Sequence, residues 1–142
     1  GYDTAFWNAM LQKGTQAGCF ASDDNHNPAK FFDALGGWVC VKSEELTHEA
    51  IVNHLLAGDY YASSGPEIMR WGVDGNEVYL ECSPAARINF IAGGLVGSSE
   101  TILEHESPLT HGLHTLHGGE SWIRGEVIDH QGRRAWTNPI WL

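Results

Sequence analysis

The sequence has few basic residues, few cysteines and no long apolar run. Its 142 residues include 8 lysines and arginines against 18 aspartates and glutamates, which gives a formal net charge of −10. This charge repels nucleic-acid phosphates, so we expect no DNA or RNA partner. No apolar run approaches the roughly 18 residues that would indicate a membrane span, so we expect no membrane partner.

The three cysteines, Cys19, Cys40 and Cys82, lack the Cys-x-x-Cys spacing of metal and redox sites. Each cysteine lies in an apolar stretch, which predicts reduced thiols that pack as small hydrophobic side chains. An odd number of cysteines cannot form a complete disulfide framework, and this favours a cytoplasmic protein. Export is the alternative if a leader precedes residue 1.

Residues 1–66 have the pattern of alternating helices and strands. Helical spacing of apolar residues predicts helices over 4–13 and 47–57, with strands over 16–22 and 37–42 between them. The second helix has sequence signals at both ends, because Thr47 is a plausible N-cap and Gly58 follows its last residue. We therefore predict β/α units of the kind that build barrels.

After residue 66 the helical periodicity disappears and short alternating stretches are separated by turns. The dipeptide Asp74-Gly75 predicts a hairpin. We expect strands at residues 67–73, 77–83, 86–92, 99–106, 113–117, 121–130 and 133–138. The predicted fold class is therefore α+β, with a partial β/α domain over 1–66 and a small all-β sandwich over 67–142.

An Asp-x-His pair, Asp24 and His26, follows the predicted strand 16–22. On an extended backbone, residues two apart point the same way, so both side chains would face one pocket. A carboxylate and an imidazole together suit zinc, manganese or iron. The alternative is a polar loop in which Asp23 or Asp24 caps a turn and His26 is solvated.

Several stretches follow one another in an order that is typical of one protein family. They are residues 6–14, with Trp-x-x-x-Leu-x-x-Gly, then 18–26, which ends on Asp-x-His, then 36–42, 45–51 and 58–66. In this order they resemble the C-terminal part of the PHP-domain metal-dependent phosphoesterases, the polymerase-and-histidinol-phosphatase group. Within this group the likeness is to the bacterial branch that has an added β domain. Residues 134–141 also resemble the C-terminal end of that branch.

The resemblance implies that Asp24 and His26 are the last metal-binding motif of the family, with Asp23 orienting them from outside the coordination sphere. The family's other ligands, which begin with a His-x-His motif, would precede this region, so we expect a C-terminal fragment that is inactive without the N-terminal part of the same protein. The complete protein would use divalent Mn, Zn or Fe to hydrolyse a small phosphate ester or another ester. No catalytic residue is assignable within the fragment. The alternative is a non-catalytic β-sandwich module that contacts a partner or a glycan.

A second group of histidines, His111, His114 and His117, is spaced His-x-x-His-x-x-His. On one strand His111 and His117 would face one side, about 20 Å apart, and His114 the other, so they could not share one ion. We therefore expect imidazoles that are solvated or hydrogen-bonded, unless partners from neighbouring strands complete a site. We likewise expect most tryptophans to fill the core rather than to form a sugar-binding platform.

Overall fold

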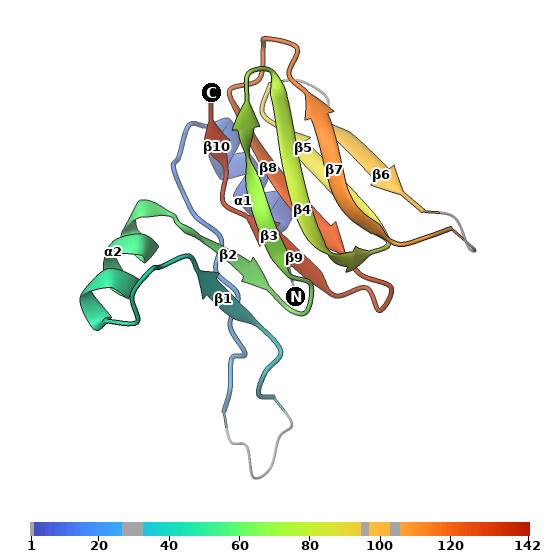
Figure 1. Ribbon diagram of the computed structural model, residues 1–142. Helices are drawn as coiled ribbons and strands as arrows, with labels where there is room; N and C mark the ends of the chain where they lie inside the picture. The colour runs from blue at the N-terminus through green and yellow to red at the C-terminus, as the bar shows by residue number, and fades with distance from the viewer. Residues whose placement is uncertain (1, 27–32, 95–96, 103–105) are drawn as a thin grey trace.

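The computed structural model describes residues 2–26, 33–94, 97–102 and 106–142, and these form two antiparallel sheets with two helices (Figure 1). The larger sheet contains, in spatial order, β1 (Trp38–Val41), β2 (Tyr60–Ser63), β9 (Arg134–Thr137), β8 (Trp122–Ile128), β5 (Arg87–Ala92) and β6 (Ser98–Thr101), while β10 (Ile140–Trp141) pairs with β8. The smaller sheet contains β3 (Ile68–Asp74), β4 (Glu77–Ala85) and β7 (Leu109–Thr115). The helices are α1 (Thr4–Gln12) and α2 (His48–Ala57).

The main core lies between the two sheets. Every second residue of β5, and of β4 as far as Cys82, is buried, as expected for strands with one face against a partner sheet. The inward residues include Leu80 and Phe90, and the Phe90 ring stacks on Trp71 with 6.2 Å between the ring centroids. Hairpin β3–β4 closes at Gly75, whose φ of 60° requires the left-handed conformation that the Asp-Gly signal predicts.

Helix α1 covers the opposite face of the larger sheet, so strand β8 is buried on both sides. Trp7 and Leu11 of α1 pack in a second core with Trp122 and Trp136. The buried guanidinium of Arg124 lies 4.5 Å from the Trp7 ring centroid and donates two hydrogen bonds to the side chain of Asn8, at 2.8 and 3.0 Å. These contacts fix α1 on the sheet.

The predicted α+β fold class, with β/α barrel units over residues 1–66, is wrong, because the described residues form a mostly β fold of two antiparallel sheets. Barrel units need parallel strands, whereas β1 and β2 pair antiparallel, from Trp38 opposite Ser63 to Val41 opposite Tyr60. Strand β2 then pairs with β9, so the larger sheet includes strands from both sides of residue 66. The division of the chain into two domains, 1–66 and 67–142, stays a prediction.

The predicted strand over 16–22 does not form, because side chains bind its backbone instead of a neighbouring strand. The Trp7 indole donates to the carbonyl of Ala17 at 2.9 Å, and the amide of Cys19 donates to the Asn138 side chain at 2.9 Å. The Asn138 amide group also donates to the carbonyls of Gly58 and Tyr60. The segment is therefore tied to α1 and to the start of β2 without joining the sheet.

Helix α2 begins and ends where the sequence predicts. The Thr47 hydroxyl accepts a hydrogen bond from the amide of Ala50 at 3.2 Å, and Gly58 has a φ of 83° at the C-cap. None of the residues of α2 is buried. Within the described ranges, no helix is long and apolar enough to cross a membrane.

Candidate functional site

Asp24 and His26 lie on a loop and not at the end of a strand. Residues 15–26 form no strand, and Asp24 has a φ of 53°, in the left-handed region. The expectation that both side chains leave one strand in the same direction therefore fails. Both side chains are exposed to solvent.

Asp23 holds the backbone of this loop against residues 35–37. Its carboxylate accepts hydrogen bonds from the amides of Leu35, Gly36 and Gly37, at 2.7, 2.6 and 2.8 Å. The amide of Gly37, followed by that of Leu35, lowers the pKa of Asp23 below its ordinary value. Asp23 therefore sets the position of the loop that presents Asp24 and His26.

The sequence analysis missed Asp33, which binds the other end of this loop. Its carboxylate accepts a hydrogen bond from the backbone amide of His26 at 2.9 Å and one from the Asn25 side chain at 3.0 Å. The Nδ1 atom of His26 lies 3.5 Å from the same carboxylate. A carboxylate beside an imidazole orients the ring, an arrangement that is common behind metal-bound histidines. No spacing rule identifies Asp33, because the contact depends on how the loop folds back.

The donor chemistry of Asp24 and His26 fits a divalent ion, but two side chains do not complete a coordination shell. Among the described residues, one group places three ligand atoms within 4.8 Å of one another, and it consists of His114, His117 and Glu120. Asp24 and His26 do not belong to it. Any ion bound by them would need further ligands from outside the described residues.

A cleft of about 830 Å³ lies beside the anchored loop. Its wall includes aromatic side chains from the N-terminus and α1, the segment 17–22, and Gly36 and Gly37, which touch Asp23. Cys19 lines the cleft, but burial raises the pKa of its thiol to about 11, so it stays protonated at neutral pH. The cleft thus offers apolar surface and no activated thiol.

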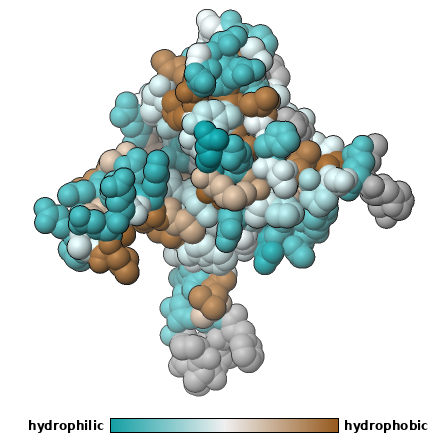
Figure 2. Space-filling model, viewed as in Figure 1, coloured by the Kyte–Doolittle hydropathy of each residue, from teal (hydrophilic) through white to brown (hydrophobic). Residues whose placement is uncertain are grey.

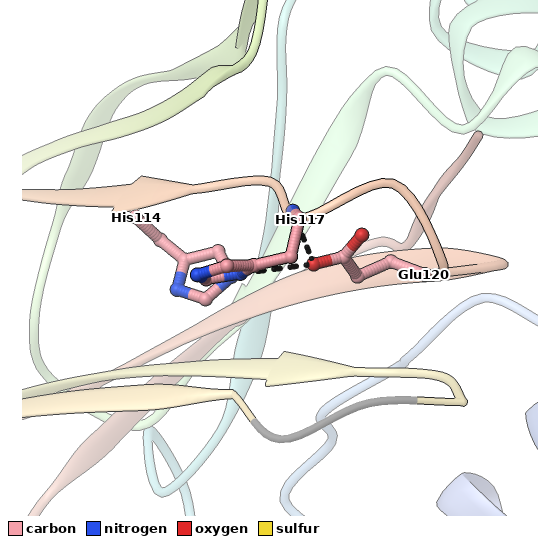
Figure 3. Close-up of side chains that lie close together, drawn as sticks. All are labelled: His114, His117 and Glu120. Atoms are coloured by element: carbon pink, nitrogen blue, oxygen red, sulfur yellow. Dashed lines mark hydrogen bonds and ion pairs between the residues drawn. The ribbon is translucent and has the colours of Figure 1, made fainter.

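The three spaced histidines do not share one strand. On β7, His111 points outward and His114 is buried. The strand ends at Thr115, so His117 lies on the loop that follows. That loop turns back at Gly118, whose φ is 85°, and brings Glu120 beside the two imidazoles (Figure 3). The Gly118-Gly119 pair is a turn signal that could have revealed this arrangement.

Comparison with known proteins found no similar family model, curated protein or solved structure.

Proposed function

We propose that this chain is the C-terminal part of a metal-dependent hydrolase and that Asp24 and His26 supply two of the ligands for its divalent ions. The resemblance of residues 1–66 to the PHP-domain group motivates this proposal. It requires no barrel units within the chain, only a preceding part of the same protein that brings the remaining ligands. This assignment implies that the complete protein hydrolyses esters. The substrate would be a phosphate ester or another small ester.

The observation that carries the proposal is exposed apolar surface in two places, beside the loop of Asp24 and His26 and at α2. Phe20 and Leu35, which flank the loop in sequence, are 65% and 83% exposed. Leu46 and Leu56, just before and within α2, are 95% and 83% exposed. Figure 2 shows brown, apolar surface on the lobe that contains α2. Side chains of this size gain free energy when they are covered, so the surface suits a covering part of the protein that also completes the metal site.

The side chains of the loop have distinct tasks in this proposal. Bound divalent ions would polarise the ester and activate a water molecule. Asp24 and His26 provide the oxygen and nitrogen ligands, Asp33 orients the His26 imidazole, and Asp23 holds the backbone between them. Removing Asp33 should therefore weaken turnover by about 10 to 100-fold, the usual effect of losing a residue behind a ligand.

A second candidate is a non-catalytic structural module, favoured by the continuity of the larger sheet. Pairing of β2 with β9 ties the N-terminal region to a sandwich that has its own core. Among the described tryptophans, Trp38 alone is exposed, at 37%, so a broad aromatic platform for a glycan is absent there. If the chain is such a structural module, Asp24 and His26 are solvated loop residues that bind no ion.

The test is the Asp24→Ala substitution in the longer protein, with turnover of 4-nitrophenyl phosphate and 4-nitrophenyl acetate measured in the presence of Mn²⁺ or Zn²⁺. We expect loss of turnover by more than about 100-fold, because the exposed loop position leaves the fold unchanged while the ion loses a ligand. Asp74→Ala, at the exposed hairpin β3–β4, is the matched control and should retain full turnover. Full activity of the Asp24→Ala protein would contradict the proposal and favour the structural module.

A further inference from the structure

The clearest cluster of ligand atoms in the described part of the chain lies between β7 and β8, away from the Asp24 loop. One ring nitrogen each of His114 and His117 and one carboxylate oxygen of Glu120 lie within 4.8 Å of one another (Figure 3). We propose that these three side chains form a zinc site that is independent of Asp24 and His26. Two imidazoles and one carboxylate are a common zinc ligand set, with the fourth position left to water or a substrate.

His114 provides the strongest observation. Its side chain is 5% exposed, and its Nδ1 atom lies 2.7 Å from the hydroxyl of Ser98 on β6. Its other nitrogen, Nε2, is buried and has no hydrogen-bond partner among the described residues. A buried polar atom without a partner costs free energy, and a metal ion would remove that cost. The Ser98 contact fits this role, because histidines that bind metal usually engage a fixed group through their other nitrogen.

Glu120 is held in place by the loop that it closes. Its carboxylate accepts hydrogen bonds from the backbone amides of His117, Gly118 and Gly119, at 2.9, 2.9 and 3.0 Å. Oε2 receives two of these bonds and Oε1 receives one, so Oε1 keeps a lone pair for an ion. Oε1 is also the atom that lies 3.5 Å from Nδ1 of His117. These bonds explain the position of Glu120 but leave Nε2 of His114 unexplained.

Binding of an ion requires the three donor atoms to move closer together. The donors of a tetrahedral zinc ion lie about 3.3 Å apart, as follows from metal–ligand distances near 2.0 Å. His114 and Glu120 are buried, whereas the His117 side chain is 67% exposed and follows the end of β7. Nδ1 of His117 already lies 3.5 Å from Oε1 of Glu120, and the exposed His117 ring can turn toward an ion without disturbing the core. Its exposed side also leaves a path for the ion and for a water ligand.

The test is calorimetric titration of Zn²⁺ into the 142-residue chain at pH 7.5. We expect one ion per chain with a dissociation constant in the micromolar range or tighter. His117→Ala is the decisive variant, because it removes an exposed ring and retains the backbone amide that binds Glu120. We expect it to weaken zinc binding at least tenfold.

Two variants separate this site from other histidines of the chain. His111→Ala alters an outward residue of the same strand, and His130→Ala alters an exposed residue just after β8. Both should bind zinc within twofold of the unsubstituted chain. Absence of zinc binding, or equal affinity in the His117→Ala chain, would overturn the proposal. The proposed hydrolase site is tested separately, by turnover of the longer protein with Asp24→Ala, so failure of this zinc site is distinguishable from failure of the hydrolase site.

Discussion

Residues 67–142 and the region before them differ in how well their apolar side chains are covered. The sandwich buries the inward faces of β4, β5 and β8 completely, with residues such as Leu80, Ile88 and Val127 at 0% exposure. By contrast, eight of the eleven large hydrophobic side chains that are exposed among the described residues lie before residue 58. The two regions have similar apolar character in sequence, so the difference lies in whether a partner surface is present.

The two helices show the same contrast within the N-terminal region. Helix α1 buries Leu11 and Trp7 against the larger sheet, whereas α2 buries no residue at all. Yet α2 has the better caps, with Thr47 at its start and Gly58 at its end, while no side chain caps α1 at Asp3. Local signals therefore specify where a helix begins and ends, but packing decides whether its apolar face contributes to stability.

The largest effect is expected from truncating matched phenylalanines in the two regions. Phe90→Ala should lower the free energy of unfolding by about 3 to 5 kcal/mol, because the ring is 2% exposed and fills the core between the sheets. Phe6→Ala should change it by less than about 0.5 kcal/mol, because that ring is 69% exposed. Urea unfolding followed by circular dichroism measures both values. A loss in free energy of unfolding for Phe6→Ala as large as that for Phe90→Ala would contradict the difference in coverage between the two regions.

A smaller effect distinguishes two carboxylates that each accept three backbone hydrogen bonds. Glu120 closes the loop between β7 and β8, while Asp23 binds the amides of Leu35, Gly36 and Gly37. Glu120→Gln should lower the melting temperature at pH 7, because the loop joins the two sheets of the core. Asp23→Asn should leave the melting temperature unchanged within a degree or two and alter only the amide signals of residues 35–37.

The difference in melting temperature between the unsubstituted chain and the Glu120→Gln chain should depend on pH, because of the pKa of Glu120. Its pKa is lowered from 4.5 to about 2 in the folded chain, so the ionised carboxylate stabilises the fold above pH 4.5. That contribution is lost as the pH falls from 4.5 towards 2. The gap in melting temperature between the unsubstituted and Glu120→Gln chains should therefore narrow over this range in thermal scans. A gap that stays constant from pH 7 to pH 2.5 would show that Glu120 acts through its shape and not its charge.

The features that the sequence predicts well depend on local chemistry. Both ends of α2 follow from Thr47 and Gly58, and the β3–β4 hairpin follows from Asp74-Gly75, because caps and tight turns depend on a few adjacent residues. The features that it misses depend on distant residues. Strand direction in 1–66 was predicted wrongly because alternating helices and strands are compatible with antiparallel pairing when the chain returns beside itself, as β1 and β2 do.

The candidate ligands show the same limit. Asp24 and His26 are visible in sequence as Asp-x-His, but the contacts that hold their loop join Asp23 to residues 35–37, and Asp33 to His26. Glu120 was missed because the periodicity of a strand was extended past Thr115, where β7 in fact ends. The histidines and Asp24 could be identified as candidate ligands from their type and spacing, whereas Asp33 and Glu120 could not, because their contacts depend on loop geometry.

Hydrogen exchange measured by mass spectrometry on the 142-residue chain tests the central contrast most directly. We expect the amides of β4, β5 and β8 to exchange slowest, those of α1 to be protected by its packing on the sheet, and those of α2 to exchange more than about 100-fold faster than those of β8. This result would show that α2 and its exposed apolar face lack a partner in the chain by itself. Protection of α2 equal to that of β8 would contradict the account, because the helix would then be stabilised without any further part of the protein.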